Sequence, residues 1–202
     1  KVDLDSTRNM PEAEQVLKKI QEIIIEDNEK NPDKPVSIGV ISPFRAQVDL
    51  IKKALWQVMS EDLIRKHQIE VGTAHTFQGD EKGVMILSFT VAENSHFQSI
   101  TFLQKPNLFN VAITRARKKL INFISKAPNT IPEGLLRDYI EYVQRAKKAF
   151  ETSNKLNFKN DFEKEVYMEL ALYLPDTNIQ AGLEIGGVSA DITIDKIDIE
   201  ID

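Results

Sequence analysis

Four basic side chains lie close together in the middle of the chain: Arg115, Arg117, Lys118 and Lys119. A guanidinium group presents a planar fork of donors that matches the oxygens of a phosphate. Apolar spacing before the run predicts a helix over residues 106–117, and the next apolar run predicts a strand over 120–124. Cations at the end of a helix also interact favourably with its dipole. The run is therefore either a phosphate-binding element or a solvated basic helix end.

A second segment of possible chemistry runs from Gly72 to Glu81, between two predicted strands. It is rich in hydroxyl, imidazole and amide groups, which bind phosphate oxygens whatever base is attached. Gly72 and Gly79 would let the backbone approach a phosphate closely. In an open α/β sheet, ligands bind in loops at the carboxyl ends of the strands. The alternative is a polar turn whose His75 bonds to the backbone.

The elements that must position these groups alternate between strand and helix. Apolar residues at helical spacing predict a first helix over residues 10–26, with Asn9 and Glu12 as a capping pair and Pro11 in the first turn. Ser42 and Pro43 are read as the N-cap and first residue of a second helix. Such alternation predicts an α/β fold with a parallel sheet flanked by helices. Predicted strands cover 36–41, 69–73, 84–91 and 120–124, and later helices begin near 135 and 162.

Composition bounds the class of protein and its division into domains. The 202 residues carry a net charge of −5 and no cysteine, which excludes disulfides and thiolate metal sites. No apolar run could span a membrane and no signal peptide is visible, so we expect a cytoplasmic protein. From Lys155 onward the chain has four lysines, no arginine and eleven acidic residues, which indicates a second unit. We predict one domain over 1–150, a linker over 151–160 and another domain over 161–202.

Three segments together resemble motifs IV, V and VI of superfamily 1B helicases, the motors related to Upf-one and Dna-two. They are Ile38–Gln47 (IGVISPFRAQ), Val71–Lys82 (VGTAHTFQGDEK) and Leu108–Arg117 (LFNVAITRAR). They occur in the order and at the spacing of that family. The resemblance covers residues 1–125 and implies the second RecA-like domain of an ATP-dependent DNA or RNA helicase.

This resemblance implies a role for individual residues. Arg115 corresponds to the arginine finger on the γ-phosphate of ATP, a group worth about 10³-fold or more in rate, and Gln78 to a second catalytic contact. The implied nucleotide-binding residues are Gly79, Glu81, Arg45, Gln47 and Arg117. The implied contacts to single-stranded DNA or RNA are Thr73, His75 and Thr76. Some relatives have another γ-phosphate arginine where this chain has Met10, so that role falls to Arg45, to Arg117 or to no residue.

The chain has no phosphate-binding loop of the Walker A type and no Walker B strand end before motif IV. Helicases of this group carry both on a first RecA-like domain, which would bind ATP with Mg²⁺. We therefore expect a fragment whose partner is that first domain, and which hydrolyses no ATP alone.

The last residues alternate between isoleucine and polar side chains, as in a hairpin turning at Asp195 and Lys196. In that register Asp191 lies opposite Glu200, with Cβ atoms about 5 Å apart. Two such carboxylates repel each other, and a hard divalent cation such as Mg²⁺ would compensate. The alternative is an exposed polar face whose charges resist aggregation.

This region also resembles the start of a PD-(D/E)xK nuclease of the very-short-patch-repair type, an α+β restriction-endonuclease-like domain. The resemblance implies that Asp191 and Glu200 hold Mg²⁺ or Mn²⁺ and that Glu163 is the helix carboxylate. Many relatives have a lysine where this chain has Asp202. Two alternatives to a motor stay open: a metal-dependent nuclease whose helicase-like region only positions nucleic acid, and a non-catalytic α/β interaction domain.

Overall fold

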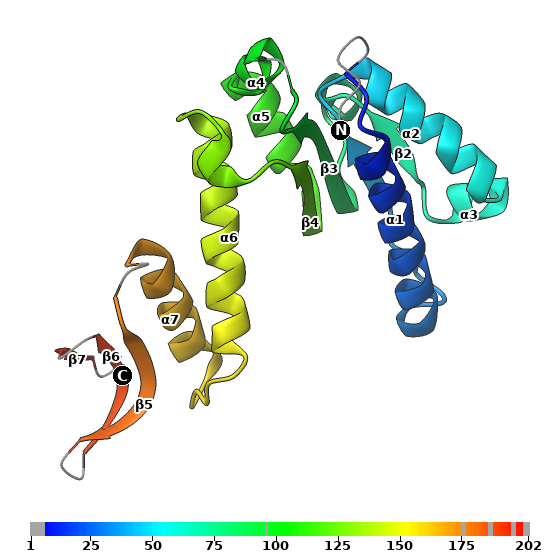
Figure 1. Ribbon diagram of the computed structural model, residues 1–202. Helices are drawn as coiled ribbons and strands as arrows, with labels where there is room; N and C mark the ends of the chain where they lie inside the picture. The colour runs from blue at the N-terminus through cyan, green and yellow to red at the C-terminus, as the bar shows by residue number, and fades with distance from the viewer. Residues whose placement is uncertain (1–6, 96, 175–176, 186–187, 195–196, 200–202) are drawn as a thin grey trace. The chain divides into compact units, whose positions relative to one another are not determined.

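The computed structural model describes residues 7–95, 97–174, 177–185, 188–194 and 197–199. The chain forms two compact units, Lys1–Leu135 and Leu136–Asp202, which are described separately. The first is a parallel sheet of four strands in the order β2-β1-β3-β4 (Figure 1). Its strands are β1 (Ile38–Ile41), β2 (Glu70–Gly72), β3 (Lys82–Ala92) and β4 (Ala116–Ser125). The predicted α/β class with a parallel sheet flanked by helices is confirmed.

Helices join β1 to β2 and β3 to β4, whereas β2 is joined to β3 by a short 3₁₀ turn. The predicted start of the first helix is confirmed, because the Asn9 side chain accepts a hydrogen bond from the Glu12 amide and Pro11 lies in the first turn. The helices are α1 (Met10–Lys30), α2 (Arg45–Val58), α3 (Glu61–Lys66), α4 (Phe97–Leu103) and α5 (Pro106–Ile113), with 3₁₀ turns η1 (Ala74–Phe77) and η2 (Pro128–Thr130). Sequence periodicity missed α3 and α4, which are only six and seven residues long.

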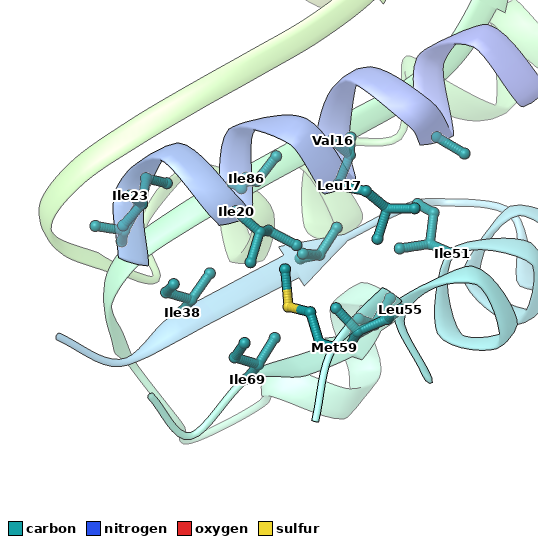
Figure 2. Packing of buried hydrophobic residues seen from close by; sticks show 14 of the residues in the cluster. Val16, Leu17, Ile20, Ile23, Ile38, Ile51, Leu55, Met59, Ile69 and Ile86 are labelled. Atoms are coloured by element: carbon teal, nitrogen blue, oxygen red, sulfur yellow. The ribbon is translucent and has the colours of Figure 1, made fainter. Parts of the chain in front are cut away.

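The main core of the first unit lies between one face of the sheet and helices α1 and α2 (Figure 2). Ile20 of α1 and Ile51 of α2 are fully buried there, as is Ile38 of β1. Alternate residues of β3 serve the two faces: Ile86 belongs to this core, whereas Phe89 stacks on Phe109 of α5 with ring centroids 6.3 Å apart. All eleven residues of β3 are buried because helices cover both its faces.

Two predicted boundaries in the first unit are wrong. Helix α2 begins at Arg45 with Phe44 as its N-cap, whereas the sequence predicted Ser42 as the N-cap and Pro43 as the first helical residue. The Ser42 hydroxyl instead lies 3.1 Å from the Thr90 hydroxyl of β3 and accepts a hydrogen bond from the Phe44 amide. The Ser42 hydroxyl therefore contacts both a neighbouring strand and a local amide, while the helix begins three residues later.

The second wrong boundary is the predicted helix over 106–117. Helix α5 ends at Ile113, and the Thr114 hydroxyl donates to the carbonyl of Asn110 in its last turn. From Ala116 the backbone is extended and pairs with β3, so the strand predicted over 120–124 begins four residues earlier. Arg117 and the lysines that follow it lie on a strand, which removes the interpretation as a basic helix end.

The second unit has helices α6 (Leu135–Ser153) and α7 (Asp161–Tyr173) and an antiparallel sheet of β5 (Ile179–Ile185), β6 (Val188–Ile194) and β7 (Ile197–Ile199). In the hairpin, Thr193 pairs with Asp198 and Ile194 with Ile197, which confirms the predicted register. Asp195, Lys196, Glu200 and Asp202 lie outside the described residues.

The division between the units differs from the predicted one. It lies at residues 135/136, whereas the sequence placed the end of the first domain at 150 and a linker over 151–160. Helix α6 continues through residue 150 to Ser153. The Lys164 ammonium of α7 contacts both the Phe150 ring and the Asn154 side chain, so the end of α6 packs within the second unit.

Candidate nucleotide and nucleic-acid interface

The segment between β2 and β3 runs back along the strand direction. It leads from the side of the sheet where the parallel strands end, called the carboxyl edge, to the side where they begin, called the amino edge. At its start, Gly72 pairs with Ile41, the last residue of β1, so this end is the carboxyl edge of the sheet. At its end, Lys82 pairs with Ala116, the first residue of β4, so that end is the amino edge. The sequence predicted one loop at carboxyl ends, but the structure divides the candidate residues between two edges.

At the carboxyl edge, the turn η1 presents His75 and Thr76 on the surface, with Thr73 half-buried before them. The Thr76 hydroxyl accepts a hydrogen bond from the Thr73 amide at 3.2 Å, which fixes the turn. Arg45 is exposed at the start of α2. Together with His75 and Thr73 it borders a hollow of about 230 Å³.

The two glycines of the segment differ from each other. Gly72 is buried, and a Cβ there would lie 2.4 Å from the Thr76 hydroxyl oxygen, so glycine is needed for packing inside the protein and not for approach of a phosphate. Gly79 is exposed, has φ +88° and would meet open space. Of the two glycines, therefore, only Gly79 leaves the backbone open for the close approach of a phosphate that the sequence predicted for both.

At the amino edge, Arg115 and Arg117 lie against the end of the same segment. The Arg115 carbonyl accepts a hydrogen bond from the Lys82 amide, and Arg117 Nη2 donates to the Glu81 carbonyl at 2.9 Å. Arg117 Nε also lies 3.8 Å from the Glu81 carboxylate. Arg115 is half-buried, and its Nε is buried with no hydrogen-bond partner among the described residues. Such an unsatisfied buried donor is rare in a folded protein and marks Arg115 as a candidate functional residue.

Lys82 supplies no free positive charge at this edge. Burial by itself would lower the pKa of Lys82, but hydrogen bonds to the Asp80 and Glu70 carboxylates outweigh it, so the pKa is raised. The ammonium lies 2.8 Å from Asp80 and 3.1 Å from Glu70. The same contact lowers the pKa of Asp80. Lys82 is thus neutralised by two acids, whereas Arg115 forms no ion pair within the described part of the chain.

The structure places Gln47 inside the fold and not on a surface that could meet a nucleotide. Its side chain is fully buried, and its Oε1 accepts a hydrogen bond from the Asn9 amide at 2.8 Å. Its Nε2 donates to the Asn9 carbonyl and to the Ser88 hydroxyl. These contacts join the start of α1 to α2 and β3 beneath the carboxyl edge.

Sequence reasoning missed the centre of this buried network, Glu12, beyond its part in the capping pair. Its carboxylate is 3% exposed and accepts hydrogen bonds from the Ser88 hydroxyl and the Thr90 amide, both at 2.7 Å. The Ser125 hydroxyl also donates to it, at 3.1 Å. Burial raises the pKa of Glu12, and these hydrogen bonds oppose the rise. No local sequence signal reveals partners that lie 76 and 78 residues away.

In the second unit, the two described acids of the predicted metal site have partners of their own. The buried Asp191 carboxylate accepts a hydrogen bond from the Lys159 ammonium, which forms an ion pair with it. Glu163 is buried and accepts from the Lys159 amide and the Asn160 side chain at the start of α7. No group of three possible metal ligands occurs among the described residues. Because Glu200 is outside them, the metal site stays a prediction.

Comparison with known proteins decides the family. A family model described as an AAA domain matches residues 1–127, more than half of the chain. The chain belongs to this family. Its relatives show that this AAA domain is a superfamily 1 helicase domain. The chain is 44% identical over 85 residues to the DNA polymerase alpha-associated DNA helicase A of Saccharomyces cerevisiae, covering 42% of the chain and 11% of that protein.

Other relatives of this helicase domain carry several different names. The DNA replication ATP-dependent helicase/nuclease DNA2 of Gallus gallus is 34% identical over 108 residues, covering 53% of the chain and 10% of that protein. A homolog of regulator of nonsense transcripts 1 in Arabidopsis thaliana is 38% identical over 113 residues, covering 54% and 9%. The chain therefore spans about a tenth of the length of these relatives. Among the described residues, no helix is long and apolar enough to cross a membrane.

Proposed function

We propose that the first unit is the part of an ATP-dependent nucleic-acid helicase that supplies the arginine finger, Arg115. The observation that carries this proposal is the half-buried guanidinium of Arg115, which forms no ion pair among the described residues and whose Nε has no hydrogen-bond partner among them. The Lys82 amide fixes the backbone of Arg115 against β3, so the guanidinium is held at the amino edge. A γ-phosphate would bind to the accessible part of the guanidinium, and in phosphoryl transfer the arginine stabilises the charge that develops there.

Neighbouring groups support the same assignment. Gly79 and Gln78 are exposed just before Glu81, so their backbone and amide groups are open to a nucleotide. Arg117 donates to the Glu81 carbonyl and lies near one carboxylate oxygen of Glu81, so the other carboxylate oxygen could accept from a ribose hydroxyl. The remainder of the site belongs to a P-loop domain, because the chain has no Walker A sequence; that domain would bind ATP with Mg²⁺.

The carboxyl edge is proposed as the surface for single-stranded DNA or RNA. Exposed His75 and Thr76, with Thr73, offer hydrogen bonds to phosphate oxygens, and Arg45 offers a positive charge with no ion pair among the described residues. ATP and nucleic acid would then lie at opposite ends of one segment. This arrangement would let ATP binding or hydrolysis at the amino edge change the affinity for single-stranded nucleic acid at the carboxyl edge.

The test is nucleic-acid-stimulated ATP hydrolysis by a protein that joins this chain to a P-loop domain. We expect Arg115→Ala to lower kcat by about 10³-fold while ATP still binds, because the arginine acts mainly in the transition state. Arg65→Ala, at an exposed arginine of α3, is the matched control and should keep normal activity. Full stimulated activity of Arg115→Ala would refute the assignment. Absence of any stimulation in the unaltered protein would favour the interaction domain.

A further inference from the structure

The hollow at the carboxyl edge is more apolar than phosphate binding requires. Its floor is made of aliphatic and aromatic side chains from β1, β3, α4 and α5: Ile41, Leu87, Phe89, Leu103 and Phe109. A backbone-binding groove needs charge and hydrogen-bond donors but no such floor. The hollow is therefore shaped for an apolar or aromatic group attached to the strand.

The volume of the hollow restricts what could enter it. About 230 Å³ is below the roughly 300–1,000 Å³ of pockets for drug-sized ligands. It exceeds the cavity of about 150 Å³ that holds a benzene molecule. The hollow is therefore large enough for one aromatic ring and smaller than a pocket for a drug-sized ligand.

The rim of the hollow is positively charged. Arg45 is exposed on it, and the Lys105 ammonium lies 4.8 Å from the centre of the Phe102 ring, which also lines the hollow. Neither cation forms an ion pair within the described residues. An aromatic pocket with the Arg45 cation on its rim suits a base whose phosphate remains outside.

Phe102 also lines a second hollow. The neighbouring hollow has a volume of about 450 Å³ and shares Pro43, Arg45 and Phe102 with the first. Phe44 holds Phe102 from this side, with ring centroids 5.8 Å apart. A single-stranded nucleic acid that passes over Arg45 would thus meet the Phe102 ring, which lines both hollows.

We propose that the hollow receives one unstacked base of the single strand, stacked against Phe102, while Arg45 binds the phosphate beside it. This inference rests on the proposed binding of single strands at the carboxyl edge. It assigns Arg45 to nucleic acid and not to the γ-phosphate of ATP, which lies toward the amino edge. It also gives helix α4, which lies outside motifs IV, V and VI, a part in binding.

The test compares two fluorescent oligonucleotides binding to the 202-residue chain: oligothymidylate and a strand of equal length whose sugars carry no bases. We expect Phe102→Ala to weaken oligothymidylate binding about fivefold or more, because stacking on an aromatic ring is lost. The same variant should leave binding of the abasic strand unchanged. Arg45→Ala should weaken both strands and lower the salt dependence of binding, because a phosphate contact is lost.

Two further variants guard against a folding artefact. Phe102→Leu keeps an apolar side chain and should fold normally, yet lose most of the preference for the strand with bases. Phe97→Ala removes an exposed phenylalanine from the same helix and should change neither affinity. A 4-thiothymidine strand should cross-link to peptides of α4 or α5 when irradiated.

The possible failures are distinguishable. If both strands bind with equal affinity and Phe102→Leu changes nothing, the base pocket is refuted while single-strand binding stands. If neither strand binds at any concentration tested, both the pocket and the proposed nucleic-acid surface are refuted.

Discussion

Replacing Glu12 should show whether the buried network beneath the carboxyl edge holds that edge together. Glu12→Ala removes the acceptor of four donors: the Ser88 and Ser125 hydroxyls, the Thr90 amide and the Asn9 side chain. The hydroxyls can rotate to other acceptors, but the Thr90 amide cannot. An unpaired buried donor costs about 1–3 kcal/mol, and loss of hydrogen bonds to a charged group adds to it.

Relief from the desolvation of a buried carboxylate offsets part of this cost. Thr90 adds to the cost because it has φ +62°, a conformation that β-branched residues avoid, and its amide bond to Glu12 helps to hold it. We therefore expect Glu12→Ala to lower the free energy of unfolding of the first unit by about 2–4 kcal/mol. Trp56, the only tryptophan, lies on α2 in that unit, so its fluorescence during urea denaturation reports this unit. Glu14→Ala, at an exposed position of the same helix, should change little.

The pH dependence gives an independent check. Burial raises the pKa of Glu12 above its ordinary value of 4.5, so between 4.5 and the folded pKa the folded state binds more protons than the unfolded state. The contribution of Glu12 to stability is therefore fully present below pH 4.5 and declines as pH rises through the folded pKa. Glu12→Gln stays uncharged, so it should gain stability relative to the unaltered protein over this window. A pH-independent difference, or an alanine variant within about 0.5 kcal/mol of the unaltered protein, would refute the reasoning.

Two other substitutions test close contacts in each unit. Gly72→Ala should lower the unfolding free energy by about 1–3 kcal/mol in the Trp56 assay, because the new Cβ would lie 2.4 Å from the Thr76 hydroxyl. Gly79→Ala, strained at φ +88° but facing open space, should cost only about 1 kcal/mol, and equal costs would contradict the packing argument. Lys159→Ala should speed hydrogen exchange of the β6 amides because Asp191 stays buried without its ion-pair partner. Adding Asp191→Asn should reverse most of that effect, and protection that is unchanged in Lys159→Ala would count against the ion pair.

Local patterns in the sequence were sufficient for much of the fold. The Asn9 and Glu12 pair with Pro11 marks the start of α1 because capping depends on residues within one turn. Alternation of strands and helices indicated the parallel sheet, and isoleucine alternation indicated the hairpin register of Thr193 with Asp198. These features depend on neighbours a few residues apart, which a sequence displays directly.

Patterns failed where distant backbone decided the conformation. Residues 115–119 carry a basic run that continues a helical pattern, yet β3 draws them into a strand through pairs such as Lys82 with Ala116. Ser42 has the side chain of an N-cap, yet it lies beside the Thr90 hydroxyl. In both cases a partner more than 30 residues away competes with the local preference.

The sequence by itself determined that this chain has a helicase-type α/β domain, because three motifs in order carry that information residue by residue. Only the tertiary structure decided that one segment crosses the sheet, with Thr73 at one edge and Glu81 at the other. Only the tertiary structure placed Gln47 in the interior and left the Nε of Arg115 buried without a described partner. Burial and the satisfaction of hydrogen bonds depend on strands brought together from distant parts of the chain. The spacing of residues close together in the sequence does not reveal those long-range contacts.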